Sequence, residues 1–196
     1  MLMNLETGAW DADLLRIFDI PSVLLPRIAG SQEVVGVCDA DFFGAEIPIA
    51  GIAGDQQAAL FGQACFHPGL IKNTYGTGCF ALMHTGAQRP VSRSRLLSTR
   101  AASASVAPAY ALEGSVFVAG AAMQFLRDNL GFFTDVKITA EIAASIPDTN
   151  GVYMVPAFTG LGAPYWEPNA RGTLTGITRG TLRPHIIRAA LESIAF

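Results

Sequence analysis

The sequence predicts an α/β protein, and three stretches carry that prediction. The small apolar residues of 44–54 are typical of a buried strand or strand end, and a helix is expected to follow directly from Asp55. Residues 116–120 likewise predict a strand that enters a helix over 121–130. Within 70–83, two β-like runs flank a glycine-containing turn, which predicts a hairpin. Strands that alternate with helices in this way are typical of α/β folds.

The rest of the chain predicts further helices and strands. They are a short amphipathic helix within 11–28 that Pro21 interrupts, strands with loops over 87–109, a helix over 137–145, a strand over 151–156 and a helix over 185–196. Asp11 or Asp13 is expected to cap the first of these helices. The last helix carries no Gly, Asn or Pro stop signal, so the sequence is expected to be a piece of a longer chain.

Composition excludes several classes of protein. Of the 196 residues, 51% are hydrophobic and 15% charged, and the net charge is −3, which excludes intrinsic disorder. Lys and Arg number 13 against 16 Asp and Glu and are scattered, so no nucleic acid partner is expected. The mean hydropathy is +0.36, and we interpret this apolar character as surface that other parts of a larger protein normally cover.

Neither a membrane span nor a metal centre is expected. No stretch of about 20 apolar residues occurs, and the first residues lack the basic start and apolar run of a signal peptide, which favours the cytoplasm. The cysteines at 38, 65 and 79 lack CxxC spacing and are expected to be free thiols. The histidines at 67, 84 and 185 lack ligand spacing, so no residue is assigned to a metal.

The first two candidates for a reaction centre are an aspartate and a glycine-containing turn. Asp55 follows a small-residue strand, with Gly51 and Gly54 nearby to let a ligand approach, so its carboxylate is a candidate to accept a proton from a hydroxyl or to lie near a metal-bound phosphate. The simpler alternative is an N-cap that bonds the amide of Gln57 or Ala58. The segment 74–78 is a candidate anion site, because glycines beside a hydroxyl in a hairpin turn can direct backbone N–H groups and the Thr hydroxyl toward phosphate oxygens. An ordinary tight turn explains the same residues.

A third candidate lies at the predicted junction between strand and helix near Gly120. Gln124 follows four residues later, so both residues are expected on one edge of a pocket at the first turn of the helix. The alternative is a helix-entry glycine with a surface glutamine.

Together, these segments resemble the glycerol kinases of the wider carbohydrate kinase family. The resemblance rests on 51–63, which begins Gly-Ile-Ala-Gly-Asp-Gln-Gln, on 73–80, Asn-Thr-Tyr-Gly-Thr-Gly-Cys-Phe, and on 160–166, Gly-Leu-Gly-Ala-Pro-Tyr-Trp. Positions within 172–192 also fit the second signature of the wider family. The matches occur in order over roughly residues 5–196.

The resemblance implies a kinase of the actin and hexokinase type, with two ribonuclease H-like α/β domains that close over a cleft. This chain would contain the end of the first domain and the first half of the second. Residues 1–63 would be the C-terminal part of the N-terminal kinase domain, and residues 64–196 the N-terminal part of the C-terminal kinase domain. Such kinases use ATP and Mg²⁺.

The resemblance also assigns the polyol site. It implies that Asp55 is the catalytic residue, which acts on the polyol hydroxyl as a general base or orients it for in-line attack on the γ-phosphate. Gln56 would contact the polyol, and Phe80 would form its apolar wall. The substrate implied is glycerol.

For the nucleotide, the resemblance implies that Thr77 binds phosphates and that Gly120 and Gln124 lie along the ATP. The function expected of the parent protein is therefore ATP-dependent phosphorylation of glycerol to glycerol 3-phosphate, by a cytoplasmic homo-oligomer. The alternatives are a kinase for another polyol or ketose of the same family and a non-catalytic interaction fragment. This chain alone is expected to be inactive.

Overall fold

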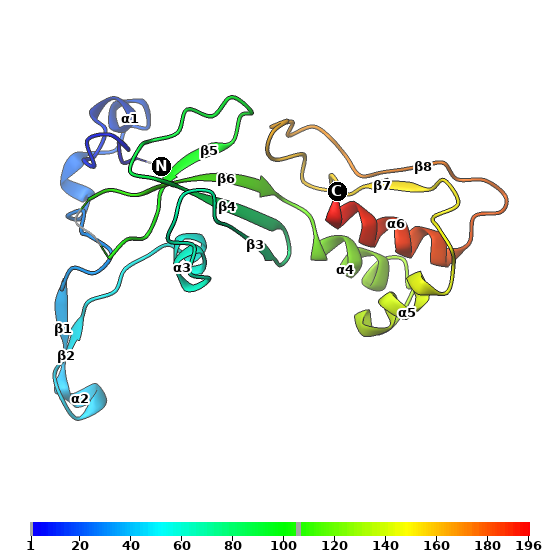
Figure 1. Ribbon diagram of the computed structural model, residues 1–196, viewed down its shortest axis with the longest axis horizontal. Coiled ribbons are helices and arrows are strands. Elements are labelled where there is room, and N and C mark those ends of the chain that lie inside the picture. The colour runs from blue at the N-terminus through cyan, green and yellow to red at the C-terminus, as the bar shows by residue number, and fades with distance from the viewer. Residues whose placement is uncertain (1, 105–106) are drawn as a thin grey trace. The chain divides into compact units, whose positions relative to one another are not determined.

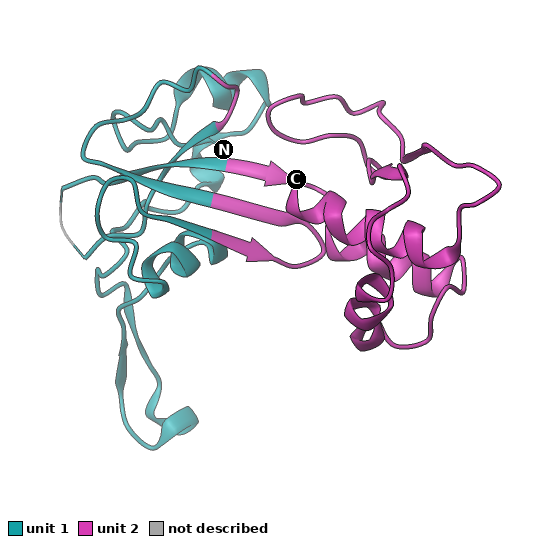
Figure 2. Cartoon of the chain, turned by 45° about the vertical axis from the view of Figure 1, so that its right-hand side comes forward, with its two compact units in different colours: residues 1–72, 82–93, 97–113 teal, residues 73–81, 94–96, 114–196 magenta. Residues whose placement is uncertain are grey.

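The computed structural model describes residues 2–104 and 107–196, and Figure 1 shows the order of its helices and strands. Met1, the first residue of the expected first domain, and residues 105–106 of the expected second domain lie outside the described residues. The chain divides into two compact units (Figure 2). Unit 1 comprises 1–72, 82–93 and 97–113, and unit 2 comprises 73–81, 94–96 and 114–196.

Unit 1 begins with the predicted capped helix. Helix α1 spans Ala12–Ile17, and the Asp11 side chain accepts hydrogen bonds from the backbone N–H groups of Asp13 and Leu14. These bonds satisfy donors that a helix start leaves unpaired, so the capping prediction is confirmed for Asp11. The helix ends well before Pro21, which precedes the short 3-10 helix η1 at Ser22–Leu24.

The next segment is an antiparallel ribbon, and it corrects one prediction. Strand β1 (Gly36–Cys38) pairs with β2 (Ile47–Ile49), and helix α2 (Ala40–Phe43) joins them. The expected buried strand over 44–54 is wrong in extent and in burial, because only β2 is a strand and its three residues are exposed. A run of small apolar residues does not by itself specify a covering layer, and among the described residues this sheet has only two strands.

Helix α3 (Asp55–Gly62) follows, as predicted, after an irregular stretch over 50–54. Leu60 is 1% exposed and anchors the helix in unit 1. The Gln57 side-chain amide donates a hydrogen bond to the Thr99 hydroxyl at 3.1 Å, which ties the first turn of α3 to strand β5 (Leu97–Arg100).

The predicted hairpin is confirmed as part of a four-stranded sheet with the order β3-β4-β6-β5. Strand β3 spans Ile71–Tyr75, β4 spans Cys79–Gly86 and β6 spans Tyr110–Val116. Strand β6 pairs with β5 in antiparallel register, with Leu97 opposite Glu113. Residues of β3, β4 and β6 belong partly to unit 1 and partly to unit 2.

The remaining elements belong to unit 2. They are α4 (Gly120–Asp128), the 3-10 helix η2 (Val136–Ile138), α5 (Thr139–Ala144), β7 (Tyr153–Val155), β8 (Thr173–Thr175) and α6 (Arg183–Ala195). Strands β7 and β8 pair antiparallel. The helices expected over 121–130, 137–145 and 185–196 and the strand over 151–156 are all present with shifted ends.

The core of unit 2 explains why α4 forms. Ala122, Met123 and Leu126 are buried at the three- and four-residue spacing of one helix face. They pack with Val152 of the turn before β7 and with Ile187 of α6 in a single apolar cluster. In the described part of the chain, no helix has the length and apolar character needed to cross a membrane.

Candidate functional site

Asp55 is the first residue of α3, and its carboxylate is exposed. Gly54 occupies the N-cap position, and its carbonyl accepts the hydrogen bond from the Ala58 N–H at 2.8 Å. The alternative of Asp55 as an N-cap is therefore wrong. Oδ1 of Asp55 instead accepts a hydrogen bond from the Gln56 N–H at 2.8 Å. Asp55 thus lies in the first turn of α3, where the helix dipole favours a negatively charged side chain.

Gln56 connects this carboxylate to a buried cation. Its side-chain Nε2 lies 3.4 Å from Oδ2 of Asp55, and its Oε1 accepts a hydrogen bond from Nζ of Lys72. Lys72 lies on β3 and is 5% exposed. Burial lowers the pKa of Lys72 from its ordinary value, while the charges of Glu113, Asp55 and Cys65 act in the opposite direction. Our sequence reasoning did not single out Lys72, although a charged residue within a β-like run was a usable signal.

The glycine turn and the start of α4 are held together by backbone hydrogen bonds. The Gly76 carbonyl accepts from the Gly120 N–H at 2.9 Å, and the Thr77 carbonyl accepts from the N–H groups of Ala119 at 2.7 Å and Ala121 at 3.2 Å. The Thr77 side chain is exposed beside this junction. The glycine turn, which we predicted to bind phosphates, and the start of α4, which we predicted to lie along the nucleotide, are thus neighbours in unit 2.

Two of these glycines are required by close approach of the backbone. A Cβ on Gly120 would lie 2.6 Å from the Gly76 oxygen, and a Cβ on Gly78 would lie 2.4 Å from the Val116 oxygen. Distances this short do not occur in real structures. A side chain on Gly120 would therefore move the turn away from α4, and one on Gly78 would move the turn away from the end of β6. The turn over 76–78 and the first residues of α4 therefore form a tightly packed cradle of backbone.

Gln124 lies one turn after Gly120 on α4, and its side chain is exposed. Phe80 is the second residue of β4 and is half-buried. Both belong to unit 2 with Thr77 and Gly120, whereas Asp55 and Gln56 belong to unit 1. The predicted nucleotide residues thus lie in one unit, and the two predicted residues of α3 lie in the other.

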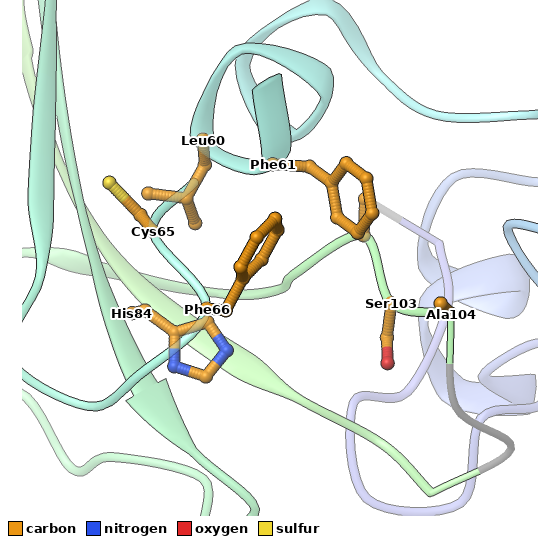
Figure 3. A pocket seen from close by; sticks show the side chains of 8 residues that line it. Leu60, Phe61, Cys65, Phe66, His84, Ser103 and Ala104 are labelled. Atoms are coloured by element: carbon orange, nitrogen blue, oxygen red, sulfur yellow. The ribbon is translucent and has the colours of Figure 1, made fainter. Parts of the chain in front are cut away.

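Unit 1 also contains an apolar cavity that sequence reasoning missed (Figure 3). Its volume is about 500 Å³, and its lining includes Phe61, Phe66 and His84. The rings of Phe61 and Phe66 meet edge to face, with centroids 4.9 Å apart. Asp55 does not line this cavity. Its walls come from segments distant in the sequence, so no local pattern marks it.

The described residues contain no cluster of metal ligands. Over 2–104 and 107–196, no group of three or more His, Cys, Asp or Glu residues is placed to hold a metal ion. Cys38, Cys65 and Cys79 are free thiols, and burial raises the pKa of Cys79.

Comparison with known proteins identifies the class to which this fold belongs. Residues 1–62 match the N-terminal domain, and residues 71–196 match the C-terminal domain, of the FGGY family of carbohydrate kinases. The chain therefore belongs to this family. Its fold is a part of the ATPase fold that actin and hexokinase share, as the resemblance implied.

Within this family, the chain is similar to glycerol kinases in particular. The chain is 59% identical over its whole length to a glycerol kinase of Delftia acidovorans and covers 39% of that protein. It matches the crystal structure of Plasmodium falciparum glycerol kinase with ADP at 39% identity and a TM-score of 0.85, over 99% of this chain and 39% of that one. A gluconate kinase of Lactobacillus acidophilus has the same fold at 25% identity, with a TM-score of 0.77 over 98% of this chain and 40% of that one. The chain thus spans about two fifths of the length of the relatives it matches.

Proposed function

We propose that this chain is the central part of an ATP-dependent kinase that phosphorylates glycerol to glycerol 3-phosphate. The observation that carries the proposal is the 59% identity to a glycerol kinase over all 196 residues. The solved relative that carries ADP and is named a glycerol kinase supports a nucleotide-dependent reaction. Because the chain spans about two fifths of those relatives, the activity is proposed for a longer protein that contains it.

In this proposal Asp55 is the catalytic residue and acts on the glycerol hydroxyl. Its exposed carboxylate at the start of α3 accepts the hydroxyl proton, or orients the hydroxyl, as the oxygen attacks the γ-phosphorus in line. Gln56 contacts the polyol, and the half-buried ring of Phe80 forms its apolar wall. Phosphoryl transfer depends on positioning and charge stabilisation more than on covalent chemistry, and these residues suit that requirement.

The nucleotide is assigned to the junction between the glycine turn and α4. Thr77, whose side chain is exposed, binds phosphate oxygens, and Gly120 and Gln124 lie along the ATP. The close backbone packing at Gly78 and Gly120 supports this assignment, because it fixes the position of Thr77 beside the start of α4. When bound, Mg²⁺ neutralises phosphate charge. We assign no side chain of this chain to the ion.

The second candidate substrate is another polyol, sugar or sugar acid. It is favoured by the gluconate kinase that has the same fold at 25% identity. The higher identity to glycerol kinases makes glycerol the first choice.

A competition assay tests the choice of substrate. The full-length protein is given MgATP with equal concentrations of glycerol, D-xylulose and gluconate, and the phosphorylated products are separated and quantified. We expect glycerol 3-phosphate as the main product. A preference for the ketose or the sugar acid would overturn the assignment of glycerol, and ATP-dependent transfer to none of them would overturn the kinase itself.

We also propose a domain boundary between residues 63 and 64. The two family matches support it, because the match to the N-terminal domain ends at residue 62 and the match to the C-terminal domain begins at residue 71. A 196-residue chain alone is expected to be inactive, since the activity is proposed for a longer protein. The cytoplasmic location and the homo-oligomer stay predictions.

A further inference from the structure

Lys72 is a buried lysine that contacts a proposed site residue, Gln56. The chain has two lysines, and Lys72 is 5% exposed, whereas Lys137 is exposed. A buried ammonium group requires hydrogen-bond partners, because taking the charge out of water is costly. One partner is Oε1 of Gln56, the residue next to the proposed catalytic carboxylate.

The chemistry of the three groups allows one arrangement of the Gln56 amide. An ammonium group only donates hydrogen bonds, and an ionised carboxylate only accepts them. With Oε1 toward Lys72 and Nε2 toward Asp55, both contacts are favourable, and the contact to Oδ2 of Asp55 measures 3.4 Å. The flipped amide would turn its donors toward the ammonium and its oxygen toward the carboxylate. Lys72 therefore determines which way the amide points.

We propose that Lys72 is a positioning residue, whose ammonium group fixes the Gln56 amide and through it holds the Asp55 carboxylate in place for attack by the substrate hydroxyl. The catalytic consequence rests on the proposed kinase function, but the structural linkage does not. Strand β3 supplies the rigid support, since backbone pairing within the sheet fixes the position of the lysine.

The surrounding charges are consistent with this role. Asp55 and Glu113, both of unit 1, and Cys65 stabilise the protonated amine against the cost of burial. Glu113 lies on β6, and Asp55 begins α3, so anionic groups from two further elements face the lysine. Removal of the lysine alone would leave Glu113 without this countercharge, and a test needs to account for that.

The test uses the full-length enzyme with Lys72→Met combined with Glu113→Gln, so that no new uncompensated charge is created. Glu113→Gln alone and Lys137→Met serve as matched controls. Displacement of a catalytic group by about an ångström costs up to about 100-fold in rate, so we expect kcat to fall about 10- to 100-fold in the double variant, with KM for ATP within about twofold of the wild type. Both controls retain kcat within about twofold.

A crystal structure of each variant supplies the readout that is independent of activity. We expect the Gln56 amide and the Asp55 carboxylate to leave their wild-type positions in the double variant and to keep them in both controls. If both side chains superpose on the wild type, the proposal is overturned, whatever the change in rate. If the wild type transfers phosphate to no acceptor, the proposed function fails, and the crystal structures still decide the linkage.

Two further variants exclude a general loss of structure as the cause. Lys72→Arg keeps a cation and its donors, and we expect it to retain the amide orientation and more than about a third of kcat. An arginine variant that folds but loses as much activity as the methionine variant overturns the proposal. In a Gln56→Met background, adding Lys72→Met and Glu113→Gln is expected to lower kcat no further, whereas additive losses would show that the lysine acts by another route.

Discussion

The N–H of Gly120 donates a hydrogen bond to the carbonyl of Gly76 at 2.9 Å, and a Cβ on Gly120 would lie only 2.6 Å from that oxygen. This contact joins the start of α4 to the glycine turn between β3 and β4. The short distance explains why position 120 requires glycine, whereas the sequence pattern alone indicated only the start of a helix there.

Gly120→Ala is therefore expected to displace the turn and weaken nucleotide binding. In the full-length enzyme we expect KM for ATP to rise at least about tenfold, because the phosphate cradle would lose its close backbone approach. Steady-state kinetics at varied ATP concentration measure the effect.

Gly62→Ala is the matched control for this prediction. A Cβ on Gly62 meets no atom within 4 Å, and alanine is favoured over glycine in a helix by about 0.5–1 kcal/mol. We expect unchanged kinetics and equal or greater thermal stability. An equal rise of KM for ATP in both variants would show that the effect does not come from the cradle.

The sheet of unit 1 is expected to make the protein sensitive to acid through His84. Its Nδ1 accepts a hydrogen bond from the Gly86 N–H at 3.2 Å, so this nitrogen carries no proton. Burial, aided by the charge of His67, lowers the pKa of His84 from its ordinary 6.5. The unfolded chain then binds this proton more readily than the folded one, so the stabilising contribution is complete above pH 6.5 and is lost as the pH falls through the lowered pKa.

Thermal melting between about pH 7.5 and 5.5 measures this loss. In His84→Gln, which keeps an acceptor but cannot take up a proton, we expect a smaller decrease in melting temperature over the same range. A decrease equal to that of the wild type would assign the acid sensitivity to other groups.

Arg100 fastens the first residues of the chain to strand β5. Its Nε and Nη2 donate to the Leu5 carbonyl at 2.9 and 2.6 Å, and the Tyr110 hydroxyl donates to the same oxygen at 3.1 Å. Arg100→Lys is expected to lower the free energy of unfolding by about 1 kcal/mol, because a lysine cannot reproduce the planar pair of donors.

Urea denaturation measures this change. The control is Arg93→Lys, because Arg93 is exposed and lies in a loop of the same unit. Equal stability of the wild type and the Arg100 variant would mean that the shared carbonyl contributes nothing measurable.

Local patterns predicted most of the regular elements, but the strand expected over 116–120 is wrong, because β6 ends at Val116 and α4 begins at Gly120. The cap at Asp11, the hairpin and the helices α3, α4 and α6 each have a signal within a few residues, which is the scale on which hydrogen bonding and side-chain periodicity act. The exposed ribbon strand β2 was mistaken for a buried one, because burial depends on what packs over a strand. Sequence alone does not supply that partner.

The candidate site was predicted in part. Asp55 and the glycine turn have local signals, but their assignment to polyol and nucleotide came from resemblance. Lys72 approaches Gln56 only because the first residues of β3 pack with α3 in unit 1, and the contact joins residues 16 positions apart. A contact between two elements cannot be predicted from the periodicity of either one.

The central claim is that the Asp55 carboxylate acts on the substrate hydroxyl, and the ratio of kcat between the full-length wild type and Asp55→Asn tests it most directly. Asparagine keeps the size of the side chain but removes its charge and its ability to accept the proton. The account predicts that kcat falls at least about 100-fold, with ATP binding and thermal stability preserved. A variant with kcat near that of the wild type would contradict it.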